Sequence, residues 1–193
     1  MAKIPPKFCI TGTGRSGTGY ISAALQTCGV NCGHERWFIR HGRQSGLDGD
    51  ASWQAIFFLR DYRGPIYLQV RDPLAGIASL AKYTVFPDWW AKFCKTDDPL
   101  ENGICAYYFR NLIYEPIAAR RWRVEDVDAD LLIWLGELAG KDIPRPLAER
   151  AIRQTSQTTN HYGDTRRLTW NDLPDNWITA QLRLMAVRYG YPI

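Results

Sequence analysis

A glycine-rich turn near the N-terminus constrains the fold of this chain more than any other feature of its sequence. Residues 8–11 are mostly apolar and predict a short strand, and residues 18–27 carry apolar side chains at helical spacing. Between them lie Gly12, Gly14 and Gly17, which predict a tight turn. A strand that leads through such a turn into a helix N-terminus forms an anion-binding site, because backbone N–H groups curl inward and the helix dipole favours negative charge.

The rest of the chain alternates between strand-like and helix-like segments, which predicts an α/β fold. We expect further strands at residues 30–32, 66–70 and 122–127. We expect helices at residues 53–60, 74–83, 100–119, 128–138 and 176–188, and a polar loop at residues 154–167. No repeat or linker interrupts the 193 residues, so we expect one domain over residues 1–193. Its fold would be a three-layer P-loop-type fold, with a short, mostly parallel sheet flanked by helices.

Composition limits the class of partner. The net charge of +4 suits a small anionic ligand and is too weak to argue for nucleic acid. Five cysteines without a CxxC pair indicate reduced thiols, and no run of eighteen apolar residues is present. The N-terminal residues lack the apolar core of a signal peptide. We therefore expect a cytoplasmic protein without a membrane span, and whether it forms a homo-oligomer stays open.

The glycine-rich turn allows more than one interpretation. A Walker A site, GxxxxGK[ST], would start at Gly12 and reach Gly17, but Thr18 and Gly19 then replace the lysine and the magnesium-binding hydroxyl. A dinucleotide site, GxGxxG, matches residues 12–17 literally, with Glu35 18 positions after Gly17. That motif alone is a weak signal, and the glycines could also serve only a tight turn.

A further interpretation is a sulfuryl-donor loop. Residues 15–18, Arg-Ser-Gly-Thr, resemble the 5′-phosphosulfate loop [KR]-S-G-T-[TS] of sulfotransferases that use 3′-phosphoadenosine 5′-phosphosulfate (PAPS), although Gly19 departs from the usual Thr or Ser. The resemblance implies that the backbone of Ser16, Gly17, Thr18 and Gly19 binds the 5′-phosphate. It also implies that Arg15 offsets charge on the departing phosphate. A sulfuryl group carries less charge than a phosphoryl group, so we expect no metal.

A second motif follows the predicted strand at residues 66–70. Arg71-Asp72-Pro73 with Ser79 eight residues after the arginine resembles the 3′-phosphate motif of the same family. In that family the arginine and the serine hold the 3′-phosphate of PAPS, which implies the same role for Arg71 and Ser79. The two motifs occur in the family's order, and together they favour the sulfotransferase interpretation over the others.

Two further segments extend the resemblance. Residues 123–127, Arg-Val-Glu-Asp-Val, are similar to the family's R-[YV]-E-D-L strand, to which we assign no chemistry. Residues 32–35, Cys-Gly-His-Glu, look like the C-G-E-E segment of tyrosylprotein sulfotransferases, whose second glutamate is the catalytic base. The resemblance favours Glu35 as the base, with His34 as the alternative because other sulfotransferases use a histidine. Adjacent side chains usually point apart, so we expect only one of the two to act.

Two segments have weaker expected roles. A late loop of sulfotransferases folds over the nucleotide, which would give Arg166 or Arg167 a phosphate contact and Ser156 a contact with the sulfuryl oxygens. The aromatic stretch at residues 83–93 could cover an acceptor or merely pack under an irregular segment.

The expected function is transfer of a sulfuryl group from PAPS to a hydroxyl or amine of a small-molecule, carbohydrate or peptide acceptor. The alternatives are a P-loop nucleotide kinase with an altered phosphate loop and a non-catalytic nucleotide-binding module.

Overall fold

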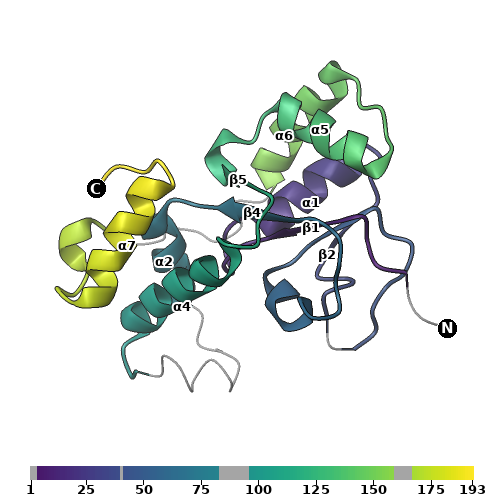
Figure 1. Ribbon diagram of the computed structural model, residues 1–193. Helices are drawn as coiled ribbons and strands as arrows, with labels where there is room; N and C mark the ends of the chain where they lie inside the picture. Colours follow the sequence, from purple (N-terminus) through teal and green to yellow (C-terminus); the bar gives the residue numbers. More distant parts are fainter. Residues whose placement is uncertain (1–3, 40, 83–95, 159–166) are drawn as a thin grey trace.

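The fold is built on one parallel sheet of five short strands. A computed structural model describes residues 4–39, 41–82, 96–158 and 167–193 (Figure 1). The strands stand in the order β2-β3-β1-β4-β5, and each pairs in parallel with its neighbour. In that order they comprise Cys32–His34, Gly49–Ala51, Phe8–Thr11, Ile66–Val70 and Arg120–Arg123.

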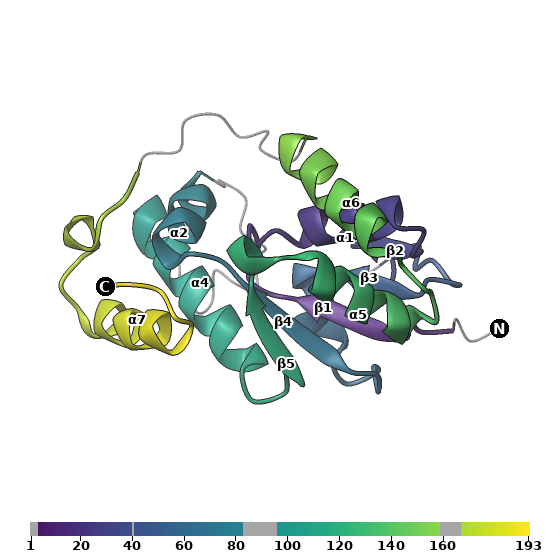
Figure 2. The same ribbon diagram turned by 90° about the horizontal axis from the view of Figure 1, so that it is seen from above.

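Helices cover both faces of this sheet and give the three layers expected from the sequence (Figures 1 and 2). One face carries α1 (Thr18–Thr27), α5 (Ala129–Ala139) and α6 (Arg145–Thr158), which pack on Phe8 and Ile10. The other face carries α2 (Pro73–Ala81), α4 (Pro99–Tyr114) and α7 (Trp177–Arg188), which pack on Leu68 and Val70. Successive side chains of a strand point to opposite faces, and this alternation separates the two hydrophobic cores.

A third cluster lies under β1 on the α2 face. Cys9 alternates with Phe8 and Ile10 along the strand and so points to the other side of the sheet. Cys9 packs against a cluster of aromatic side chains, Trp37, Phe38, Phe58 and Tyr62. Phe58 belongs to η1 (Trp53–Phe58), which this cluster packs against the sheet. The rings of Phe38 and Tyr62 lie 5.2 Å apart in an edge-on arrangement, as do many aromatic pairs in protein cores.

Several of the predicted element boundaries are confirmed, and several are wrong. The strands at residues 8–11 and 66–70 and the helix at residues 18–27 have the predicted bounds. The second strand occupies residues 32–34 rather than 30–32, and the last strand ends at Arg123, where η2 (Val124–Asp126) begins. The predicted loop at residues 154–167 is wrong for residues 154–158, which belong to α6. The sequence did not predict β3 or the first residues of α6. A short helix, η3 (Trp170–Asp172), precedes α7 and was not predicted either.

The strand order places a switch point between β1 and β4. The chain leaves β1 through α1 toward the β2 edge, and it leaves β4 through α2 and α4 toward the β5 edge. Ligands of open α/β sheets bind outside the carboxyl ends of the strands where connections diverge in this way. The fold therefore directs attention to the segments that follow Thr11 and Val70.

Within the described residues, no helix is both long and apolar enough to span a membrane.

Candidate functional site

The glycine-rich turn is a compact loop between β1 and α1. The backbone N–H of Ser16 donates to the carbonyl of Thr13 at 3.1 Å, and Gly17 caps α1 in the left-handed conformation with φ 88°. A Cβ atom on Gly12 would lie 2.3 Å from the carbonyl oxygen of Gln69, so this position admits only glycine. Arg15 also has a positive φ, 74°, in a region that non-glycine residues seldom adopt outside functional sites. The turn thus directs the free N–H groups of the α1 N-terminus toward the strand ends.

Gln69, on β4, forms a hydrogen bond with the backbone of the turn. Its side-chain nitrogen donates to the carbonyl of Ser16 at 2.9 Å, and its side-chain oxygen accepts from the indole N–H of Trp122 at 2.9 Å. Gln69 is fully buried, so both hydrogen bonds are protected from water and would be costly to break. A hydrogen-bonded chain therefore links β5, β4 and the turn.

The second motif lies directly beside the first. Asp72 caps α2 by accepting the backbone N–H of Ala75 at 2.7 Å, and Pro73 occupies the first turn of the helix. The Nε of Arg15 donates to the Oγ of Ser79 at 2.8 Å, and the Nη1 of Arg71 donates to the carbonyl of Arg15 at 3.2 Å. The structure thus brings the predicted residues of both motifs together at the carboxyl ends of β1 and β4.

The hydroxyl of Ser16 sits inside this arrangement. Its Oγ is buried and has no hydrogen-bond partner among the residues that the structure describes. A buried hydroxyl without a partner is costly, so this position in the turn is energetically unusual.

His34 and Glu35 lie next to the turn at the end of β2. His34 Nε2 is 3.3 Å from the hydroxyl of Thr18 and 3.6 Å from the Oε1 of Glu35. The other carboxylate oxygen of Glu35 accepts the side-chain N–H of Gln54 at 2.9 Å. The expectation that the two neighbouring side chains point apart is wrong. Glu35 has φ 56°, and this left-handed backbone interrupts the alternation of a regular strand.

Asp50 fixes the chain that follows Glu35. Its carboxylate accepts the backbone N–H groups of Arg36, Trp37 and Phe38 at 3.1, 3.0 and 3.0 Å. Burial raises the pKa of Asp50 above the usual value of an aspartate, and these three hydrogen bonds oppose the rise. Asp50 therefore holds the segment that follows Glu35, whose carboxylate contacts His34 and Gln54.

Arg110, on α4, places a buried cation next to Gly14 of the turn. Only 3% of this residue is exposed, and its guanidinium lies 4.5 Å from the centre of the Trp53 ring. A Cβ atom on Gly14 would come within 3.2 Å of the guanidinium, so the glycine permits this close approach. Burial lowers the pKa of Arg110 to about 10, and the group remains a cation at neutral pH.

Sequence reasoning missed Arg110, Gln69 and Gln54. A signal existed for Arg110, because it is the one charged residue in the otherwise apolar or neutral segment 102–114 of a predicted helix. The glutamines carried no such signal, because their contacts depend on which strands become neighbours.

The remaining predicted site residues have different outcomes. Thr18 is buried and faces His34, and a Cβ atom on Gly19 would lie 3.5 Å from the His34 ring. Arg167 is exposed, and Arg166 and the aromatic stretch at residues 83–93 lie outside the described residues. The backbone of Ser156 is part of α6, but its side chain is not among those that the structure describes.

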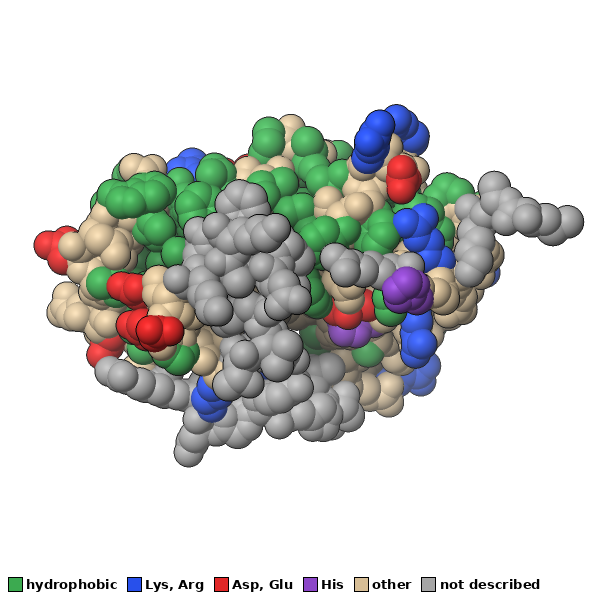
Figure 3. Space-filling view, turned by 90° about the horizontal axis from the view of Figure 1, so that it is seen from below, with side chains coloured by type: hydrophobic (Ala, Val, Ile, Leu, Met, Phe, Trp, Pro, Cys, Tyr) green, Lys and Arg blue, Asp and Glu red, His purple; other side chains and the backbone are tan. Residues whose placement is uncertain are grey.

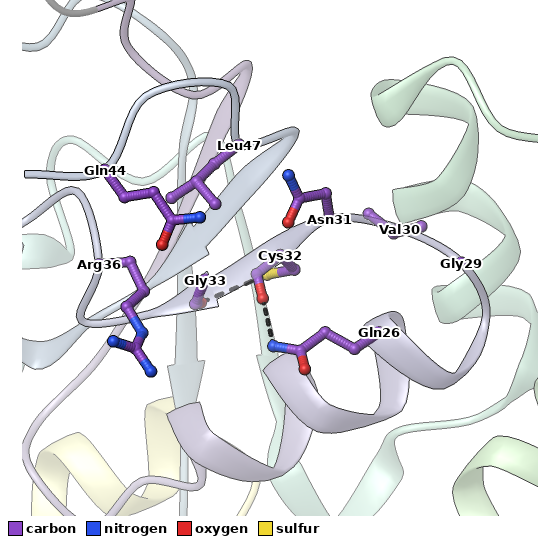
Figure 4. A pocket seen from close by; sticks show the side chains of 9 residues that line it. All are labelled: Gln26, Gly29, Val30, Asn31, Cys32, Gly33, Arg36, Gln44 and Leu47. Atoms are coloured by element: carbon purple, nitrogen blue, oxygen red, sulfur yellow. Dashed lines mark hydrogen bonds between the residues drawn. The ribbon is translucent and has the colours of Figure 1, made fainter.

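A pocket of about 360 Å³ lies along the outer edge of β2 (Figure 4). Side-chain amides contribute to its lining, and one of them, from Gln26, donates to the carbonyl of Cys32 at 2.6 Å. The lining residues are Gln26, Gly29, Val30, Asn31, Cys32, Gly33, Arg36, Gln44 and Leu47. None of the predicted site residues lines this pocket, so it is separate from the strand ends that carry the two motifs.

Charge is unevenly distributed on the molecular face seen in Figure 3. Basic side chains lie mainly toward the right end of this face, acidic side chains lie mainly toward the left, and hydrophobic side chains gather along its upper part. The described basic side chains on this face are separated by other types of residue. In the same described part of the chain, no three His, Cys, Asp or Glu side chains converge to hold a metal ion.

A search of protein-family models, curated proteins and solved structures returns no significant match to this chain.

Proposed function

We propose that this chain is a sulfotransferase that uses PAPS as donor and a hydroxyl or amine as acceptor. The observation that carries the proposal is the direct contact between the two motifs: Arg15 bonds Ser79 at 2.8 Å, and Arg71 bonds the backbone of Arg15 at 3.2 Å. Two guanidinium groups, a buried hydroxyl and a helix N-terminus meet at the switch point of the sheet. That arrangement suits a nucleotide with two separate anionic groups.

Each part of the site has a role in this reaction. The backbone N–H groups of Gly17, Thr18 and Gly19 bind the 5′-phosphate, while that of Ser16 closes the turn on Thr13. Arg71 with Ser79 binds the 3′-phosphate. The acceptor oxygen or nitrogen attacks sulfur, a new bond to sulfur forms, and the bond from sulfur to the 5′-phosphate oxygen breaks. Arg15 stabilises the negative charge that develops on the departing 3′-phosphoadenosine 5′-phosphate (PAP).

The acceptor's proton passes to Glu35 in this mechanism. Gln54 holds one oxygen of its carboxylate, and the other faces His34, which leaves the group near the α1 N-terminus. A carboxylate fixed in this way at the entrance of the site is suited to general-base catalysis. His34 is the alternative base, since its Nε2 lies between Thr18 and Glu35.

The kinase alternative has less support. A nucleotide kinase needs a hydroxyl on magnesium directly after a P-loop lysine. In this chain Thr18 stands at the lysine position, and its hydroxyl faces His34 at 3.3 Å. Gly19, which follows, has no side chain to contact a metal.

Calorimetric titration with PAP, and separately with ATP plus magnesium, tests the proposed function. We expect micromolar binding of PAP, weaker binding of ATP, and a loss of PAP affinity of about tenfold or more in Ser79→Ala, because a hydrogen bond to a charged group is removed. Ser45→Ala is the matched control, since Ser45 is exposed in a loop.

Preference for ATP with magnesium would replace the proposal with the kinase. PAP binding without PAP release from PAPS, across phenol, sugar and amine acceptors, would favour the non-catalytic module.

A further inference from the structure

The peptide unit between Arg71 and Asp72 is held at both of its polar atoms. The carbonyl of Arg71 accepts a hydrogen bond from the hydroxyl of Tyr107 on α4. The backbone N–H of Asp72 donates to the Oε1 of Glu125 at 2.9 Å. A peptide unit is planar, so holding its oxygen and its nitrogen sets the direction in which the Arg71 side chain leaves the strand.

The C-terminal segment in turn holds Glu125. The hydroxyl of Tyr191 donates to the Oε2 of Glu125 at 2.7 Å, so both oxygens of this carboxylate are engaged. Burial, together with the hydrogen bond to Glu125, raises the pKa of Tyr191 above its usual value. The phenol therefore remains protonated and able to donate.

Residues of β5 bring Tyr191 to this place. Arg123 donates to the carbonyl of Gly190 at 2.9 Å, and its guanidinium lies 5.3 Å from the centre of the Tyr191 ring. Arg121 donates to the carbonyl of Arg188 at 2.8 Å. The end of the chain is thus fixed against β5, with the Tyr191 hydroxyl directed at Glu125.

From these contacts we infer that Glu125 and Tyr191 are positioning residues for Arg71 and so determine how well the site recognises a 3′-phosphate. The inference rests on the proposed function, and it gives a role to the Arg-Val-Glu-Asp-Val segment, to which the sequence assigned no chemistry. A guanidinium binds phosphate well when its fork is already aligned, because fewer rotamers are then lost on binding. Glu125 and Tyr191 supply that alignment through the backbone and do not themselves contact the ligand.

The inference predicts a selective loss of affinity. In Tyr191→Phe the ring stays and only the hydroxyl is lost. In Glu125→Gln an NH₂ group, which only donates, replaces one of the two carboxylate oxygens that accept from Asp72 and Tyr191. Each variant is expected to lower PAP affinity about threefold to tenfold, in line with one supporting hydrogen bond, and to leave affinity for adenosine 5′-monophosphate (AMP) within about twofold.

Calorimetry with PAP and AMP on wild type, Tyr191→Phe, Glu125→Gln and a control provides the test. Tyr189→Phe is the control, because its hydroxyl lies on the same C-terminal segment but next to Glu115. Urea unfolding of each variant establishes that the proteins compared are folded.

The outcomes separate the inference from the proposed function. A smaller ratio of PAP to AMP affinity in both variants, with Tyr189→Phe like wild type, supports the inference. An unchanged ratio, or an equal loss for PAP and AMP, overturns it and leaves the proposed function in place. If the wild-type protein does not prefer PAP to AMP, the proposed function is wrong, and the inference that rests on it is wrong as well.

Discussion

Arg15 lies 56 residues before Arg71 and 64 before Ser79 in the sequence, yet in the structure the three form a continuous set of contacts. Ser79 accepts a hydrogen bond from Arg15, whose carbonyl accepts one from Arg71. The residue types suit anion binding, because a guanidinium offers several donors in a fixed plane and a hydroxyl adds one more. At the scale of single residues, the contacts of Arg15, Arg71 and Ser79 are therefore what supports the proposed binding of a nucleotide with two anionic groups.

Glu35 is the residue on which turnover should depend most strongly. Glu35→Gln removes the proton acceptor and keeps the shape of the side chain. We expect the rate of PAP formation from PAPS to fall by about 10²- to 10⁴-fold, the usual contribution of a general base. PAP affinity should stay within about twofold, because Glu35 is not among the residues that bind the nucleotide. Stopped assays of PAP formation, paired with calorimetry, measure both quantities.

His34→Gln is the matched variant for this prediction. It should lower the rate less than Glu35→Gln, because in the proposed mechanism Glu35 takes the proton and His34 only adjoins it. A larger loss in His34→Gln than in Glu35→Gln would assign the proton transfer to the histidine.

At the scale of elements, η2 packs closely against the turn at Gly17. A Cβ atom on Gly17 would lie 2.7 Å from the Cγ2 of Val124, and the residue has a positive φ. Gly29 has a similar φ of 80° but no heavy atom within 4 Å of its Cβ position. The two glycines therefore separate the cost of the backbone conformation from the cost of the steric clash.

Alanine at these two positions should have unequal effects on the free energy of unfolding. Gly29→Ala should cost about 1–2 kcal/mol, the conformational penalty alone. Gly17→Ala should cost about 1–3 kcal/mol more, because the new methyl overlaps Val124. Urea unfolding measures both values, and Val124→Ala in the Gly17→Ala background should recover part of the difference. Equal costs at the two positions would mean that η2 does not press on the turn.

Elements whose local sequence carries a clear pattern could be predicted from the sequence. β1, α1 and β4 have the expected bounds, because each combines a hydrophobic period with a terminating Gly, Pro or Arg-Asp-Pro signal. β3 could not be predicted, because Gly, Asp and Ala are poor strand formers. Its position depends on tertiary packing, since a Cβ atom on Gly49 would lie 2.2 Å from the Phe8 ring.

α6 was missed although the sequence carried a signal for it. Leu147, Ala148, Ala151 and Ile152 recur at helical spacing and pack on the core, but the helix is polar overall and runs into the polar stretch that suggested a loop. The candidate site shows the same division. Its Arg, Ser and Gly residues lie in recognisable local motifs, whereas Gln69 and Arg110 contact the turn only because β4 and α4 pack beside it.

At the scale of the whole molecule, the order of the strands turns separate motifs into one site. β1 and β4 are neighbours at the centre of the sheet, and their carboxyl ends carry the turn and Arg71. β5 and the segment after it support both, since Trp122 reaches the turn through Gln69 and Glu125 reaches the peptide unit of Arg71. The sheet order thus explains why residues late in the chain contact a turn that begins near residue 12 and the segment after β4.

Recognition of a 3′-phosphate by Arg71 is tested most directly by measuring the dissociation constants of PAP and AMP for wild type and Arg71→Ala. The two ligands differ only in the 3′-phosphate, and the two proteins differ only in the side chain proposed to bind it. We expect wild type to prefer PAP by about tenfold or more, as is typical of charge-assisted hydrogen bonds, and Arg71→Ala, which keeps Ser79, to lose most of that preference. The same preference in both proteins would contradict a 3′-phosphate site at the end of β4.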